Sequence, residues 1–187
     1  NGRASSRTLA DVVSDICIRS GVSHFDVSRL YGLVRGYIVN DVTTARSALQ
    51  PLMLTYGFDA IERNGVLVFE NRDGKQDHVV TDADLALDPS REAPVTLIRA
   101  PTAEITGRVQ LGYVDAEADY EVGVSEAIQP DERSFGVART EVSLALTRGE
   151  GARTVSRWLQ ESRLATDSAA FAMPPSQNKV KVGDVVA

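Results

Sequence analysis

Cysteine and histidine are scarce in this 187-residue sequence, which contains one cysteine and two histidines. A single cysteine excludes an internal disulfide. A structural zinc site built from Cys and His takes four ligands, more than the chain can supply. Cys17 falls in an apolar helical pattern, and we interpret it as a small buried hydrophobic residue, not a nucleophile.

Long hydrophobic runs and an excess of positive charge are also missing. The apolar stretches span four or five residues, as at 65–69, whereas a membrane-spanning helix needs about 18. Lysine and arginine total 20 against 26 acidic residues, which gives a net charge of −6. Nucleic-acid-binding domains usually show a basic patch or a pI above about 9. Because the pI here is near 5.0, we do not expect tight binding of DNA or RNA.

The common catalytic and nucleotide-binding motifs are absent as well. The sequence has no glycine-rich loop followed by Lys-Ser/Thr, no Gly-x-Gly-x-x-Gly after a strand and no Gly-x-Ser-x-Gly turn. Gly149-Glu150-Gly151 places an acid where a phosphate would sit, which favours a turn before a helix. We therefore assign no catalytic residue, expect no cofactor and predict that the chain is not an enzyme.

What is present is a mixed hydrophobic pattern, and over residues 1–75 it predicts a helix–strand–helix–hairpin unit. Three-and-four spacing predicts helices over 7–20 and from 43 or 44 to 56. Between them we expect a short helix or turn at 26–31 and a strand at 34–39. Asn64-Gly65, flanked by apolar runs, is typical of a tight hairpin turn.

The remaining residues predict a β-rich unit reached by an extended connection. Residues 76–104 form the connection, with three prolines within 86–104 and one strand near 78–81. Residues 105–187 form the second unit, with a helix over about 150–166. Its strands are expected at 104–114, 120–129, 137–146, 168–173 and 179–186. The fold class is therefore α+β.

An acidic segment is the most distinctive charge feature. Positions 115–133 contain seven acids against one basic residue. Asp115, Glu117, Asp119 and Glu121 alternate, so an extended backbone would point all four to one side. One interpretation is a solvated loop or edge strand, which like charges protect from unwanted pairing. The other is a surface that repels passing nucleic acid.

The same acids also have the spacing of a calcium-binding loop. Asp115, Glu117, Asp119 and Glu126 occupy the first, third, fifth and twelfth positions of such a loop. The sixth position of that loop requires glycine for its sharp turn, and here it is Tyr120. We therefore expect no metal site.

Several short segments, in order, resemble one family of virion proteins. This sequence resembles the tail-hub and tail-tip family of siphophages and alphaproteobacterial gene transfer agents. The resemblance is strongest to the very large tail-tip proteins of the gene transfer agents. In the first half the matching residues are Val34-Arg35-Gly36-Tyr37, Thr44 to Leu52, Tyr56 to Ala60 and Gly65 to Phe69. In the second half they are Tyr113-x-Asp115, Asp119-Tyr120, the helix after Leu144-Ala145-Leu146-Thr147 and Val182 to Val186.

This resemblance implies a structural virion component at the tail tip or baseplate hub. It implies a small, barrel-like β unit with an inserted helix, and assembly as a trimer with other tail and baseplate hub proteins. DNA would pass through the axis without tight binding, and other domains would contact the recipient cell envelope. Asp115, Glu117, Asp119 and Glu121 would then face the channel, since fixed negative charge repels phosphates.

Two further expectations concern the ends of the chain and an alternative function. The sequence begins with Asn1 and ends on Val185-Val186-Ala187, which has the pattern of an opening strand, so we expect a fragment of a larger chain. The alternative function is a tail-associated cell-wall hydrolase or sugar-binding module. Such an enzyme needs facing carboxylates, and Glu150 and Glu161 are the pair whose neutralisation would test it.

Overall fold

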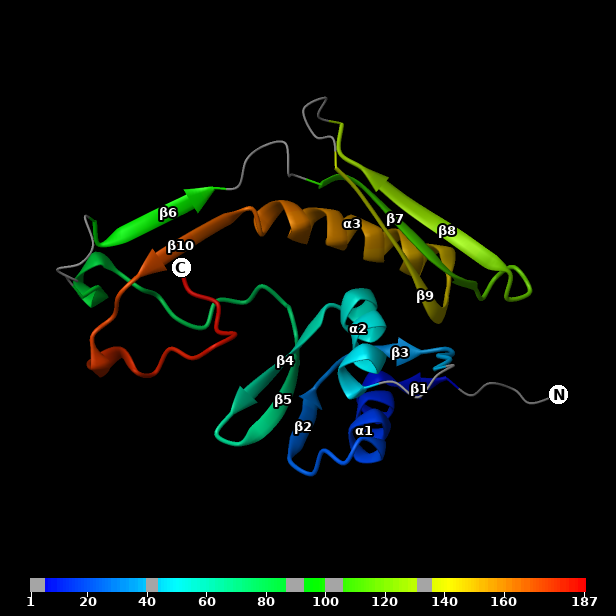
Figure 1. Ribbon diagram of the computed structural model, residues 1–187, viewed down its shortest axis with the longest axis horizontal. Coiled ribbons are helices and arrows are strands. Elements are labelled where there is room, and N and C mark those ends of the chain that lie inside the picture. The colour runs from blue at the N-terminus through cyan, green and yellow to red at the C-terminus, as the bar shows by residue number, and fades with distance from the viewer. Residues whose placement is uncertain (1–5, 40–43, 87–92, 100–105, 131–135) are drawn as a thin grey trace.

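The computed structural model describes residues 6–39, 44–86, 93–99, 106–130 and 136–187. It is a mixed α+β fold, as the sequence predicts, with a layered body and an extended arm (Figure 1). In chain order the elements are β1 (Arg7–Thr8), α1 (Leu9–Arg19), β2 (Phe25–Arg29), β3 (Leu33–Val34), α2 (Ala45–Tyr56), β4 (Phe58–Arg63), β5 (Val66–Asn71), the 3₁₀ turn η1 (Asp82–Asp84), β6 (Val95–Arg99), β7 (Thr106–Asp115), β8 (Val122–Ile128), β9 (Gly136–Leu146), α3 (Arg148–Leu164), β10 (Asp167–Phe171) and the 3₁₀ turn η3 (Pro175–Gln177).

The first part of the body packs α1 and α2 beside a sheet in the order β2-β5-β4. Each helix starts at a threonine whose hydroxyl accepts a backbone N–H: Thr8 from Asp11 N at 3.1 Å and Thr44 from Ser47 N at 3.3 Å. Gly57 ends α2 in the left-handed conformation, at φ 65°. These local signals explain why both helices were predictable, and the positive φ angles of Asn64 and Gly65 explain the same for the β4–β5 hairpin.

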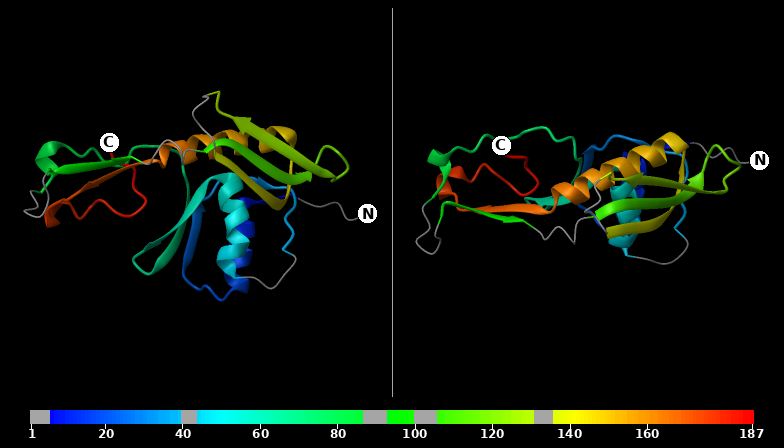
Figure 2. Two further views of the ribbon diagram at one scale, coloured as in Figure 1. Left: turned by 45° about the horizontal axis from the view of Figure 1, so that its top comes forward. Right: turned by 90° about the horizontal axis from the view of Figure 1, so that it is seen from above.

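The second part of the body is a sheet in the order β8-β7-β9, with α3 across one face (Figures 1 and 2). β7 pairs antiparallel with β8 and parallel with β9. Thr147 and Glu150 form a capping box at the start of α3, so this helix begins two residues earlier than predicted.

One hydrophobic core joins the two parts. Its fully buried members include Leu9 of α1, Leu52 of α2, Phe58 of β4, Leu111 of β7 and Val155 of α3. The rings of Phe58 and Phe69 meet edge to face, with centroids 6.2 Å apart. Cys17 is fully buried in this core, which confirms its interpretation as a hydrophobic residue.

The arm extends from the body as a two-stranded ribbon with loops beside it (Figure 2). β6 pairs antiparallel with β10, and β10 begins three residues after α3 ends. All five residues of β6 are exposed. No described residue of β6, β10 or 172–187 belongs to the hydrophobic core.

Some expected elements take another form. The barrel-like second unit is an open three-stranded sheet in the part of the chain that is described. The segment 26–31 is mainly strand β2, which pairs parallel with β5, and within 34–39 only Val34 belongs to a strand. Residues 78–81 and 179–186 form no strand and share one bridge, His78 with Val186. Within the described ranges, no helix is long and apolar enough to cross a membrane.

Candidate functional site

The acidic segment contains one buried carboxylate that organises a tight loop. Asp115 ends β7 with 5% of its surface exposed. Its carboxylate accepts hydrogen bonds from Glu117 N at 2.8 Å and Arg148 Nε at 3.1 Å. The bond from Glu117 N is the main reason that the pKa of Asp115 lies below its ordinary value, and the bond from Arg148 lowers this pKa further. Asp115 therefore holds the loop together and links it to the start of α3.

The one-sided row of acids that an extended backbone would give does not form, because residues 116–120 are turns. Within these turns, Asp119 and Tyr120 adopt left-handed φ angles of 49° and 63°. The Glu117 carboxylate turns back to accept Arg148 N at 3.0 Å. Glu117, Asp119 and Glu121 are exposed, whereas Asp115 is not. Three of the four acids thus remain available to solvent, from a loop instead of a strand.

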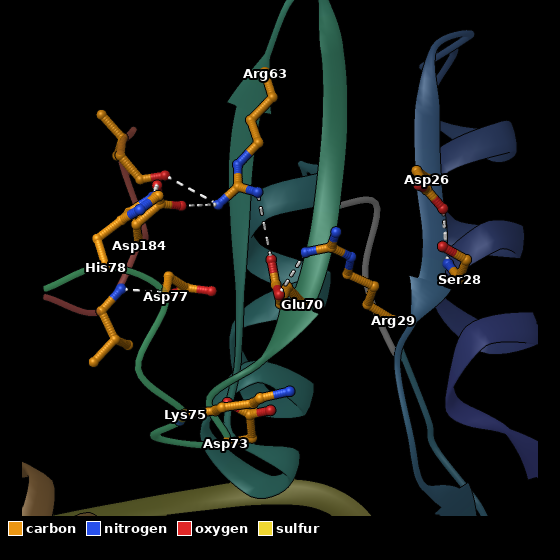
Figure 3. Close-up of polar contacts among 12 residues, drawn as sticks. Asp26, Ser28, Arg29, Arg63, Glu70, Asp73, Lys75, Asp77, His78 and Asp184 are labelled. Atoms are coloured by element: carbon orange, nitrogen blue, oxygen red, sulfur yellow. Dashed lines mark hydrogen bonds and ion pairs between the residues drawn. The ribbon is translucent and has the colours of Figure 1, made fainter. Parts of the chain in front are cut away.

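A chain of alternating charges lies on the other side of the body (Figure 3). Arg29 of β2 pairs with Glu70 of β5 at 2.8 Å, and Glu70 lies 3.8 Å from Arg63 of β4. Arg63 Nη2 donates to Asp184 Oδ1 at 2.9 Å, and the other oxygen of Asp184 lies 3.0 Å from His78 Nε2. The Asp184 side chain is only 10% exposed, so this pair is well shielded from water.

Local backbone geometry fixes Asp184 in this position. Its carboxylate also accepts Lys181 N at 2.8 Å, and this bond is the main reason that the pKa of Asp184 is lowered. Gly183, at φ 89°, packs so closely on Ile61 that a Cβ atom would lie 2.2 Å from Ile61 Cδ1. Sequence patterns do not indicate this cluster, because Arg63 and Asp184 lie 121 residues apart and the members share no motif.

A shallow cleft of about 280 Å³ lies between the end of α2 and α3. Arg157 Nη2 reaches across from α3 to the carbonyl oxygens of Leu54 at 2.6 Å and Thr55 at 2.8 Å. Burial lowers the pKa of Arg157 and raises that of Tyr56, which also lines the cleft. Arg157 therefore satisfies the carbonyl end of α2, and the arrangement stabilises the α2–α3 contact.

No catalytic or metal-binding constellation is evident in the described ranges. These residues contain no group of three or more His, Cys, Asp or Glu side chains that could hold a metal ion. Glu150 accepts bonds from Thr147 and Arg35, and Glu161 pairs with Arg72. Both carboxylates are thus bound to structural partners.

Exposed apolar side chains form the other notable surface. On the sheet face opposite α3, Val122 is 81% exposed, and Val124 and Ile128 are also exposed. On the ribbon, Leu97 is 80% exposed. Exposed apolar side chains gathered in this way often mark contact surfaces.

A family model described as a putative phage tail protein matches residues 44–187. This chain belongs to the phage tail protein family. A chain in the structure "Virion of native gene transfer agent (GTA) particle" is 51% identical, with a TM-score of 0.91 over 100% of this chain and 42% of its own length. The resemblance seen in the sequence is therefore confirmed, and the chain spans less than half of that particle protein.

More distant tail proteins share the fold. The tail protein from Neisseria meningitidis MC58 is 11% identical, with a TM-score of 0.58 over 89% of this chain and 50% of its own. The 43 kDa tail protein of prophage MuSo2 from Shewanella oneidensis is 13% identical, with a TM-score of 0.50 over 90% of this chain and 49% of its own. No curated protein matches the chain.

Proposed function

We propose that this phage tail protein is a structural part of the tail tip or baseplate hub of a gene transfer agent particle. The observation that carries the proposal is the 51% identity and TM-score of 0.91, over the whole chain, with a component of such a virion. At this identity both the fold and the packing surfaces are expected to be retained. The role is mechanical, and depends on shape and assembly.

The assembly we propose is a trimer around the tail axis, in contact with other tail and baseplate hub proteins. Exposed Val122 and Val124 of β8 support it, because β8 is an edge strand whose one acid, Glu126, is paired with Arg108. Such an edge has little charge to prevent pairing with another chain. Contact with the recipient cell envelope would fall to other domains of the full protein.

The acidic loop supports a role in DNA passage that involves three exposed acids instead of four. Asp115 fixes the loop, and the exposed acids Glu117, Asp119 and Glu121 would face the channel and repel phosphates.

Replacing Asp119 and Glu121 by lysine would then lower the frequency of gene transfer per particle by at least about tenfold, with particle numbers unchanged. Matched lysines at Asp82 and Asp73 serve as controls. Equal transfer by both double variants would remove the channel role.

A non-enzymatic role is part of the same proposal. The ion pairs and capping bonds of Glu150 and Glu161 support it, since both carboxylates are bound by neighbouring side chains. We expect no clearing of peptidoglycan in a zymogram of the protein. Clearing that disappears in the Glu150→Gln, Glu161→Gln variant would favour the hydrolase alternative.

Location in the particle is tested by labelling. Cells that produce particles with an epitope tag on this protein are lysed, and purified particles are decorated with gold-labelled antibody. We expect gold at the end of the tail farthest from the head. Gold along the whole tail, or on the head, would contradict the tail-tip proposal.

A further inference from the structure

The arm is attached to the body in an unusual way. We define the arm as residues 76–86, 93–99 and 167–187, and the body as the other described residues. The arm contributes no residue to the hydrophobic core. Its position therefore does not depend on apolar packing of the kind that joins the two parts of the body.

Polar contacts between arm and body converge on one side chain. Among the described residues, and away from the α3–β10 junction, the hydrogen bonds and ion pairs that cross from arm to body all come from Arg63 of β4. Its Nη2 donates to Asp184 Oδ1 at 2.9 Å and to the Val182 carbonyl at 3.4 Å. The contact of Gly183 with Ile61 lies beside them. We call this group, Arg63 with Val182–Asp184, the clasp (Figure 3).

The arm side of the clasp is built firmly. Residues 77–80 and 185–187 exchange backbone bonds, including Val80 N to Ala187 O at 2.8 Å and Ala187 N to His78 O at 3.1 Å. The Asp77 carboxylate accepts Val185 N at 2.9 Å. His78 binds Asp184 from this segment, so the arm presents a preassembled acceptor to Arg63.

The chain also provides pivots. α3 ends at Leu164, and residues 165 and 166 form a turn before β10 begins. On the other side, β5 ends at Asn71 and Gly74 lies at φ 67° in an exposed connection that precedes the arm. Short turns of this kind absorb the dihedral change when one part of a protein rotates on another.

We propose that the arm is a hinged element, held against the β4–β5 hairpin by the Arg63–Asp184 clasp and released when this ion pair is broken. Closed and open states would share the same folded body, because opening uncovers Ile61, which packs against Gly183, but no member of the main hydrophobic cluster. This inference goes beyond the structural tail role, since it assigns a movable part and the contact that controls it.

Electron–electron distance measurement tests the hinge directly. Spin labels are placed at Ala60→Cys on β4 and Ser168→Cys on β10, both exposed positions, with the buried Cys17 replaced by alanine. At low salt we expect one narrow distance distribution. Asp184→Asn removes the charge at nearly constant shape, and we expect the ratio of open to closed molecules to rise about tenfold or more.

The matched control is Asp59→Asn. Asp59 lies on β4, as Arg63 does, but it forms its ion pair with Arg72, which belongs to the body. This variant should leave the distribution narrow. An unchanged narrow distribution in Asp184→Asn, or equal broadening in Asp59→Asn, would overturn the proposal. Circular dichroism checks that each variant keeps its helices.

Discussion

Asp115 shows how one carboxylate can determine the shape of a loop. With Glu117 N and Arg148 as donors, its charged form is stabilised in the folded protein, so its pKa is lowered there. A lowered pKa contributes stability that is present above the ordinary value of 3.8 and is lost as the pH falls through the folded value. Asp115→Asn should therefore lower the midpoint of urea unfolding at pH 7 and reduce the acid sensitivity of unfolding.

The neighbouring Asp119 provides the control for Asp115. It is exposed and lies at φ 49°, a conformation that asparagine tolerates well. Asp119→Asn should leave the urea midpoint nearly unchanged. If the two variants unfold alike, Asp115 is not the residue that holds the loop.

Two glycines in the first turn of α3 differ in how close the neighbouring side chains lie. A Cβ at Gly151 would come within 2.7 Å of Tyr113 Cε1 and 2.6 Å of Ser125 Oγ, because α3 crosses the sheet closely there. A Cβ at Gly149 would make an ordinary contact, 3.7 Å from Arg153 Nη1. Gly151→Ala should cost about 1–3 kcal/mol of unfolding free energy through overpacking.

Gly149→Ala should instead stabilise the protein by up to about 1 kcal/mol, because alanine favours the helix and its Cβ makes only an ordinary contact with the Arg153 side chain. Urea unfolding of the two variants measures both effects. If Gly151→Ala stabilises the protein, the distance between α3 and the sheet must be larger at Gly151 than described above.

Elements with local signals were predictable from the sequence, and elements made by distant pairing were not. The threonine caps, Gly57 and Asn64-Gly65 act within a few residues, so α1, α2 and the hairpin could be predicted. β2 was missed because it pairs with β5, about 40 residues away. The left-handed Gly183 interrupts the strand expected at 179–186.

The candidate site was predictable only in part, for the same reason. The acidic composition of 115–121 could be seen directly, but its turns depend on the bond between Asp115 and Arg148, 33 residues away. The Arg63–Asp184–His78 cluster has no sequence pattern at all. Family resemblance identified the class of protein because it uses the order of many weak matches along the whole chain.

For the whole molecule, the clasp predicts that acid releases the arm. The bonds from Lys181 N and His78 and the positive charge of Arg63 lower the pKa of Asp184, so the clasp is stable above the ordinary aspartate value of 3.8 and weakens as the pH falls through the lower, folded value. Glu70, on the far side of Arg63, is the other carboxylate in the same chain of charges. The distance between labels at 60 and 168 should broaden in acid before the helices are lost.

The acid response has its own control in the Asp184→Asn variant, whose distance distribution should be broad at every pH. Broadening of the unsubstituted chain only together with loss of helical circular dichroism would mean that arm and body unfold as one unit.

Assembly is predicted to depend on the exposed face of the β8-β7-β9 sheet. Val122→Lys changes a side chain that is 81% exposed, so its effect on folding should stay within about 0.5 kcal/mol. Particles that carry it should nevertheless lose this protein from the tail, as measured by mass spectrometry of purified particles. The control, Val79→Lys, alters another exposed valine away from the sheet and should be incorporated normally. Normal incorporation of Val122→Lys would show that this face is not a contact surface.

Electron cryomicroscopy of purified particles at side-chain resolution tests the proposed structural role at the tail tip. We expect three copies of this fold around the axis at the end of the tail farthest from the head. Density for the fold in the head or along the tail tube, or its absence from the particle, would contradict it.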